Sequence, residues 1–218
     1  MKVVVTGTRG IPDILGGVET HCEELFPRIA KKGIDVTIIR RKSYVHDSLR
    51  ECGDVKLVDI KTPKKKSLEA IVHTLKAILK AKELRADIAI GPALLTPLAR
   101  LLGMKIVFTH HGPDYNRDKW GKVARFMLKM GERMGCMFAN EVIVISEVIN
   151  DILVRKYNRR DCHLIYNGVS KPAKILETNY LDELGVEPHK YVFAMGRFVP
   201  EKNFHNLIHA FVAIEQTD

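Results

Sequence analysis

The sequence lacks several features that would fix the class of a protein at once. It has no apolar run approaching the roughly 18 to 20 residues of a membrane span, and Met1–Gly7 is typical of a strand entering a turn rather than of a signal peptide. These absences predict a cytoplasmic protein. Its four cysteines are scattered, without a CxxC pair or a cluster with histidine, which disfavours a disulfide framework and a zinc site.

Several ligand-binding motifs are also absent. The P-loop pattern GxxxxGK[ST] does not occur, and no DxD pair is available to hold a nucleotide sugar through a divalent ion. We therefore expect no metal cofactor. A basic motif interleaved with aromatic residues is missing too, which argues against nucleic acid as a partner.

What is present indicates an ordinary globular chain with an anionic partner. With 218 residues, of which 46% are hydrophobic and 28% charged, it can form one full core and part of another. The formal net charge of +9 suits a nucleotide sugar, an anionic membrane surface or nucleic acid, and charge alone does not choose among them. A solvated basic surface without a ligand is the alternative.

Short β-branched runs alternate with amphipathic stretches from the first residue onward. This alternation predicts an α/β fold, a Rossmann-like doubly wound parallel sheet covered by helices. Helices are expected through Val18–Ile29 and over 67–85, 97–103, 119–138 and 147–157. Strands are expected over 3–6, 35–40, 55–60, 87–91, 105–109, 141–145 and 162–166.

The composition changes after Asn167-Gly168, which predicts two domains, 1–169 and 170–218. The second opens with a linker and continues with a short helix near 180–184, a strand over 191–195 and a helix over 203–213. Because a doubly wound domain needs on the order of 100 residues, we expect this domain to be incomplete at Asp218.

The first strand leads into a glycine-rich turn, Gly7–Gly17, at the carboxyl edge of the predicted sheet, where such folds bind ligands. Gly16 and Gly17 allow close approach to the backbone, and the following helix N-terminus favours an anion. A tight turn without a ligand is the alternative. A dinucleotide site is also possible, but the spacing is GxxG, and the second strand ends in Arg40-Arg41, which could suit a 2′-phosphate, instead of an acidic residue.

A polar segment, Thr109–Trp120, follows the fifth predicted strand at the same edge. The imidazole of His111 can donate to or accept from a sugar hydroxyl and can stabilise developing charge. Its alternative is a loop histidine held by the neighbouring backbone, and for His110 we prefer that alternative.

The loop Gly196–Asn203 opens a helix directly after a predicted strand. Arg197, Lys202 and the helix N-terminus together suit a pyrophosphate. Cations fixed there would stabilise the charge that grows on a departing diphosphate. A basic loop without a ligand is the alternative.

Two basic stretches could rest on an anionic membrane surface, and a lipid-linked acceptor would explain both. A core-packed helix beside a solvated loop is the alternative. The stretches are Lys61 with Lys64-Lys65-Lys66, and 119–130 with Trp120, Phe126 and Met127 as apolar contacts.

These motifs, taken in order, resemble bacterial family 4 glycosyltransferases, in the rhamnosyltransferase-like subgroup. The similar segments are Gly7–Pro12, Gly16–Thr20 with Glu19, Gly112–Trp120, Val144–Ser146, Ile165–Val169 with Asn167, and Gly196–Asn203. Position 111 is histidine, as in the wider family, where the subgroup often carries aspartate.

The resemblance implies two Rossmann-like domains, independence of metal, and retention of the anomeric configuration. It implies that Gly16 and Gly17 lie near the donor phosphates and the acceptor, and that His111 lies near the transferred sugar. Glu19, Ser146 and Asn167 become candidates for substrate or donor binding. Arg197 and Lys202 are implied on the diphosphate.

The expected function is transfer of a sugar from a nucleoside-diphosphate sugar to a hydroxyl of a surface glycan, which the basic stretches suggest is lipid-linked. The leaving phosphate itself would take the proton. No side-chain nucleophile is evident; Asp13, Glu19 and Asp114 are the residues among which one would be sought. The family's C-terminal Glu-x7-Glu region is absent, so we expect little transferase activity from these residues alone. The alternative is a non-catalytic module that binds glycan, membrane or a partner chain.

Overall fold

The computed structural model describes residues 1–63, 66–116, 120–168, 171, 173, 179–196 and 198–215. The chain divides into two compact units, Met1–Gly168 and Val169–Asp218. Of the candidate residues, Arg197 lies outside the described part, as do Lys64, Lys65 and 117–119 of the two basic stretches. Within the described part, no helix has the length and apolar character needed to cross a membrane.

The first unit is built around an eight-stranded sheet in the order β3-β4-β2-β1-β5-β6-β7-β8. All neighbouring pairs are parallel except β3 and β4, which are antiparallel. Without β3 this is the doubly wound order, with a reversal of direction beside β1. The strands are β1 (Lys2–Val5), β2 (Asp35–Arg41), β3 (Glu51–Cys52), β4 (Val55–Ile60), β5 (Ile88–Ile90), β6 (Lys105–His110), β7 (Glu141–Val144) and β8 (His163–Leu164).

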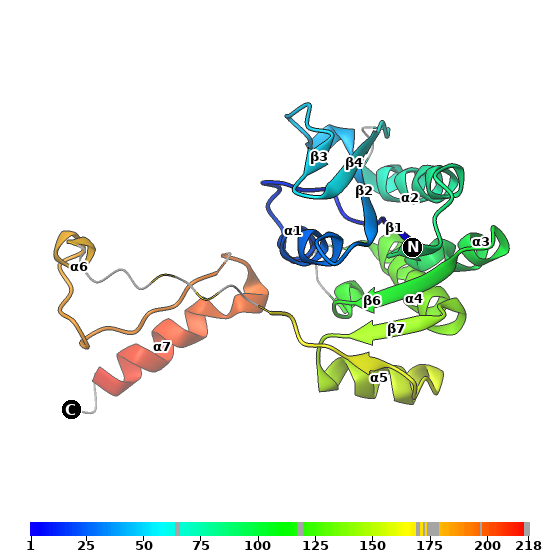
Figure 1. Ribbon diagram of the computed structural model, residues 1–218. Helices are drawn as coiled ribbons and strands as arrows, with labels where there is room; N and C mark the ends of the chain where they lie inside the picture. The colour runs from blue at the N-terminus through cyan, green and yellow to red at the C-terminus, as the bar shows by residue number, and fades with distance from the viewer. Residues whose placement is uncertain are drawn as a thin grey trace. The chain divides into compact units, whose positions relative to one another are not determined.

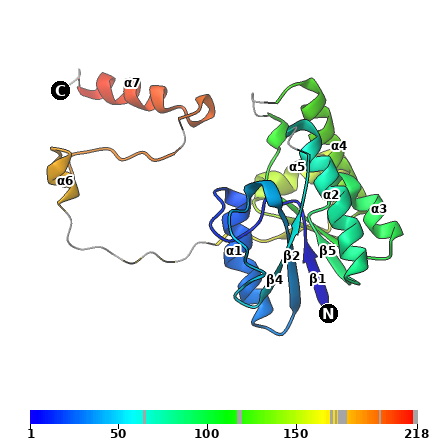
Figure 2. The same cartoon turned by 90° about the horizontal axis from the view of Figure 1, so that it is seen from above.

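Helices cover both faces of this sheet (Figures 1 and 2). Alternate residues of each strand point to opposite faces, so β1 sends Val4 to one core and Val3 and Val5 to the other. The core with Val4 contains buried residues of four helices, and the other contains those of α1 alone. The helices are α1 (Gly17–Ala30), α2 (Lys66–Glu83), α3 (Thr96–Leu101), α4 (Lys122–Phe138) and α5 (Glu147–Tyr157); short 3₁₀ turns are η1 (Lys42–Tyr44), η2 (Ala93–Leu95) and η3 (Asp114–Asn116).

Local sequence explains where these helices lie and end. In α1 the buried residues Cys22, Phe26 and Ala30 recur every four positions and form one stripe against the sheet. The helix α5 begins after Ser146, whose hydroxyl accepts from the Ile149 N–H, and it ends at Asn158 in the left-handed region.

All seven strands predicted for the first unit are confirmed, within a few residues at their ends. The prediction missed β3, because a two-residue strand carries no periodic pattern. Its existence depends on pairing with β4, where Glu51 lies opposite Lys56.

The second unit contains α6 (Tyr180–Glu183), a 3₁₀ turn η4 (Pro200–Lys202) and α7 (Phe204–Glu215). The two predicted helices are thus confirmed, but the strand predicted over 191–195 is wrong: these residues form neither a strand nor a helix. Strand structure needs a neighbouring strand to pair with, and the described residues of this unit contain no other strand.

Candidate functional site

A cavity of about 490 Å³ lies at the carboxyl edge of the first unit's sheet. It sits beside the point where β1 leads to β2 on one side and β5 leads to β6 on the other. Chains diverge there toward opposite faces, which leaves a crevice for ligands. Its lining is mainly apolar and comes from the strands, from η2 and from α1, α2 and α4. A smaller set of side chains is polar: Thr6, His21, Arg41, Thr74, Thr109, His110, His111, Asp114, Tyr115 and Glu132.

His111 and His21 meet in this cavity. His111 directly follows β6, and His21 lies on α1, so the two rings contact each other edge to face with centroids 5.4 Å apart. Burial lowers the pKa of both imidazoles, and the neighbouring His21 and His110 lower that of His111 further. Both rings are therefore neutral at pH 7, so each can donate one hydrogen bond and accept another, as binding to a sugar hydroxyl requires.

His110 has a structural role. Its Nδ1 accepts from the Gly112 N–H at 3.1 Å, so Nε2 carries the proton and donates to Glu132 Oε2 at 2.8 Å. Both side chains are 4% exposed. The preferred interpretation of His110 as a structural histidine agrees with these contacts, which fix the backbone that leads to His111.

Glu132 of α4 collects donors from three elements. Besides His110, its carboxylate accepts from Tyr157 Oη at 2.6 Å, Lys156 Nζ at 2.8 Å and Tyr115 Oη at 3.3 Å. Burial opposes the charge, but these hydrogen bonds outweigh it and hold the pKa of Glu132 at about 2. The charged carboxylate thereby ties η3, α4 and α5 together on one side of the cavity.

The glycine-rich turn is held by Glu19. Its Oε1 accepts from the Arg9 N–H at 3.0 Å and the Thr8 hydroxyl at 3.3 Å, and the side chain is buried. Gly16 is the N-cap of α1 and Gly17 its first residue. In this structure Glu19 therefore acts on the turn, and none of the three residues lines the cavity.

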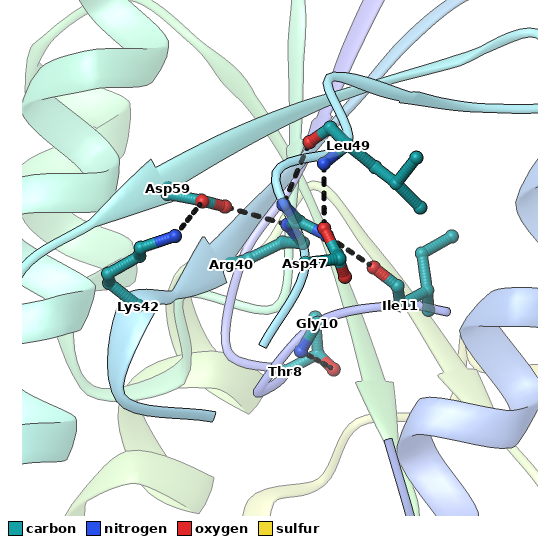
Figure 3. Close-up of polar contacts among 8 residues, drawn as sticks. All are labelled: Thr8, Gly10, Ile11, Arg40, Lys42, Asp47, Leu49 and Asp59. Atoms are coloured by element: carbon teal, nitrogen blue, oxygen red, sulfur yellow. Dashed lines mark hydrogen bonds and ion pairs between the residues drawn. The ribbon is translucent and has the colours of Figure 1, made fainter. Parts of the chain in front are cut away.

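The two arginines at the end of β2 have different environments because consecutive strand residues point to opposite faces. Arg40 is fully buried, and its guanidinium donates to both side-chain and main-chain oxygens (Figure 3). Arg41 lines the cavity. The acceptors of Arg40 are Asp59 Oδ1 at 2.7 Å, Leu49 O at 2.9 Å, Ile11 O at 3.1 Å, and Asp47 Oδ1 and Oδ2 at 3.1 and 3.3 Å. Because Arg40 is fully buried and engaged in these contacts, it is not accessible to the 2′-phosphate of a dinucleotide.

The remaining predicted residues lie elsewhere. Ser146 caps α5, Asn167 is exposed near the end of the first unit, and Lys202 belongs to η4 of the second unit. Ser146 and Asn167 do not line the cavity. Their functional assignments, and that of Arg197, stay predictions.

Sequence reasoning missed His21 and did not separate Arg41 from Arg40. His21 could have been found, since it follows Val18 by three residues and so lies on the apolar face of the helix, where a polar residue is unexpected. Among the residues with described positions, no group of three or more His, Cys, Asp or Glu could hold a metal ion.

The first unit is a Rossmann-like domain with a cavity at its switch point, the place where domains of this class bind nucleotides. Residues 15–171, more than half of the chain, match Glycosyltransferase Family 4. The chain belongs to this family.

No curated protein is significantly similar to the chain in sequence. Among solved structures, it is similar to the apo form of the lipopolysaccharide outer core galactosyltransferase WaaB (17% identity, TM-score 0.49, 78% of this chain and 46% of that chain). It is also similar to Arabidopsis thaliana UGT89C1 complexed with UDP-L-rhamnose (16% identity, TM-score 0.48, 84% of this chain and 55% of that chain). A third similar structure is a UDP-N-acetylglucosamine 2-epimerase (15% identity, TM-score 0.48, 72% of this chain and 44% of that chain). The chain spans about half the length of these structures.

Proposed function

We propose that the chain supplies the acceptor-side domain of a retaining glycosyltransferase, which moves a sugar from a nucleoside-diphosphate sugar to a hydroxyl of a surface glycan. The observation that carries this proposal is the cavity at the switch point of a family 4 domain, with the neutral His111 at its wall. A neutral imidazole there suits a polar, uncharged group such as a sugar hydroxyl.

The proposed reaction forms a bond between the acceptor oxygen and the anomeric carbon, and it breaks the bond from that carbon to the diphosphate. Attack occurs on the face from which the diphosphate leaves, which retains the configuration. The acceptor's proton passes to the leaving phosphate oxygen. His111 orients the reacting sugar, Arg197 and Lys202 bind the diphosphate, and no metal takes part.

The proposed acceptor is a lipid-linked glycan of bacterial polysaccharide biosynthesis, reached at the cytoplasmic face of the membrane. The exposed side of the first turns of α4 supports this, because Val123 and Phe126 are 78% and 60% exposed beside the exposed Lys122. Apolar side chains flanked by lysine are typical of contact with an anionic membrane surface. Membership of the rhamnosyltransferase-like subgroup belongs to the same proposal.

The test combines transfer and binding. Radiolabelled UDP-, GDP- and dTDP-sugars are incubated with the chain and with bacterial membranes as the source of acceptor, and the anomeric configuration of the product is determined by NMR. Binding of short oligosaccharides is titrated in parallel. Because little activity is expected from these residues alone, we expect weak but measurable transfer of the radiolabel, without added metal ion. His111→Ala should lower this transfer at least about 100-fold.

His46→Ala is the matched control, since this histidine is exposed and outside the cavity. Oligosaccharide binding without any transfer would favour the non-catalytic binding module. Neither binding nor transfer, or equal activity of the two alanine variants, would contradict the proposal for this cavity.

A further inference from the structure

Arg41 lines the cavity, and its guanidinium has N–H donors without acceptors among the described residues. Its Nε is buried without a hydrogen-bond partner, and its Nη2 lies 3.5 Å from Gly7 O, at the limit of a hydrogen bond. No carboxylate of the described residues lies within ion-pair distance of it. The neighbouring Arg40 shows what a structural arginine looks like here, because its donors are taken by Asp47, Asp59 and two carbonyl groups.

The two acidic residues whose charges act on Arg41 are engaged elsewhere. Glu69 of α2 accepts from the Ser43 hydroxyl at 2.8 Å and from Tyr44 Oη at 3.3 Å. Glu19 accepts from Thr8 and from the Arg9 N–H. The positive charge of Arg9 also acts on Arg41, and the Arg9 guanidinium lies 5.2 Å from the centre of the Tyr44 ring.

A partly buried guanidinium with open donors is costly unless an anion completes its contacts. Burial lowers the pKa of Arg41, with Glu69 acting in the opposite direction, yet an arginine stays charged at pH 7. The charge and its fork of donors match the geometry of a phosphate.

The wall that shares this cavity is apolar. α2, η2 and α4 contribute aliphatic side chains, and the cavity's volume of about 490 Å³ is that of a site for a small organic ligand. The residues of this wall are Ala70, Ile71, Leu94, Leu95, Met127 and Leu128.

We propose that Arg41 binds the phosphate of an amphipathic acceptor whose hydrocarbon portion lies against this aliphatic wall. The inference rests on the proposed function, and it names the class of acceptor: a phosphorylated lipid, in contrast to a free sugar or a sugar phosphate. Arg41 is then a residue that determines specificity.

Calorimetric titration of the chain with geranyl phosphate, below its aggregation concentration, tests this. Geraniol, inorganic phosphate and glucose 1-phosphate are titrated in parallel, so that the apolar and anionic parts are measured separately. We expect geranyl phosphate to bind at least about tenfold more tightly than each of the other three. Arg41→Gln should weaken the affinity for geranyl phosphate at least about tenfold, because a hydrogen-bonded charge is lost. It should leave the affinity for geraniol unchanged.

Arg50→Gln is the matched control, since it removes one exposed arginine from outside the cavity. A measurement on the unmodified chain guards against misfolding of the variant: the NMR signal of the Arg41 Nε–H should shift on addition of geranyl phosphate. Equal affinities of Arg41→Gln and Arg50→Gln, or an unmoved signal, would overturn the phosphate subsite. Equal binding of glucose 1-phosphate would overturn the lipid assignment.

These outcomes are separable from those of the proposed function. Binding of geranyl phosphate that depends on Arg41, without sugar transfer to any acceptor, would support the phosphate subsite and contradict the proposed transferase function. Transfer to glycans without binding of geranyl phosphate would do the reverse.

Discussion

At the residue scale, Glu132 should be among the side chains on which folding depends most. In Glu132→Gln the amide can accept only through one oxygen, and its NH₂ group faces donors, which leaves buried hydrogen-bonding groups unsatisfied. We expect a loss of about 2–3 kcal/mol in the free energy of unfolding, measured with urea.

The chain offers a control with the same pair geometry. Glu141 and His163 are also 2.8 Å apart, but both side chains are more than half exposed. Glu141→Gln should therefore change the free energy of unfolding by less than about 0.5 kcal/mol. Similar losses in the two variants would show that the buried network around Glu132 contributes no more than a surface pair.

His73 predicts a pH dependence. The side chain is fully buried on α2, and burial together with the nearby Arg41 lowers its pKa to about 4. Because the pKa is lower in the folded state, the unfolded chain binds the proton more tightly, and stability falls as the pH drops from about 6.5 toward 4. The contribution of this residue is about 3 kcal/mol over that range.

His73→Leu should remove this part of the pH dependence, whatever the variant's stability at pH 7. Urea unfolding midpoints measured between pH 7 and pH 4 provide the test, with His46→Leu, at an exposed position, as the control. A slope in His73→Leu that equals that of the unmodified chain would exclude His73 as the titrating group.

At the element scale, the start of α1 depends on one of its two glycines. A Cβ at position 16 would overlap Glu19 Oε2, whereas one at position 17 would meet nothing within 4 Å. Gly16→Ala should push the Glu19 carboxylate away from Thr8 and the Arg9 N–H and cost about 1–3 kcal/mol in the free energy of unfolding. Gly17→Ala should be neutral, and both can be compared by urea unfolding and by the amide signals of residues 8–16. Equal effects would mean that the turn does not depend on Glu19.

The sequence predicts elements best where the pattern is local. The strands of the first unit were predictable because β-branched runs alternate with helical stretches. The ends of two helices were predictable because Gly33 and Gly103, which follow them, adopt the left-handed region. The segment 191–195 has the composition of a strand, but strand structure depends on a partner distant in the chain, which composition does not report.

The candidate site shows the same limit. His111 was predictable because it directly follows a strand, at the edge where ligands bind. The contact of His21 with His111 was not predictable, because it joins residues 90 positions apart through the packing of α1. Strand alternation predicts that Arg40 and Arg41 point to opposite faces of the sheet. The sequence does not indicate which of these two residues lines the cavity.

At the scale of the whole molecule, the net charge of +9 is consistent with the proposed contact with an anionic membrane. We expect the chain to sediment with vesicles that contain anionic phospholipid and to dissociate from them as the salt concentration rises through the physiological range. It should not bind purely zwitterionic vesicles. Electrostatic attraction alone would predict this for any basic protein, so the apolar component must be tested separately.

Phe126→Ser tests the apolar component at the first turns of α4, which follow β6 at the carboxyl edge of the sheet. Leu101, 85% exposed, ends α3 just before β6 begins, at the opposite edge, so Leu101→Ser removes an exposed apolar side chain from a face that should not touch lipid. At constant salt, Phe126→Ser should weaken vesicle binding about three- to tenfold because its ring no longer inserts, and Leu101→Ser should not weaken it. Equal binding by the two variants would mean that charge alone attracts the chain to the vesicles. It would contradict the orientation in which the cavity's edge of the sheet faces the membrane.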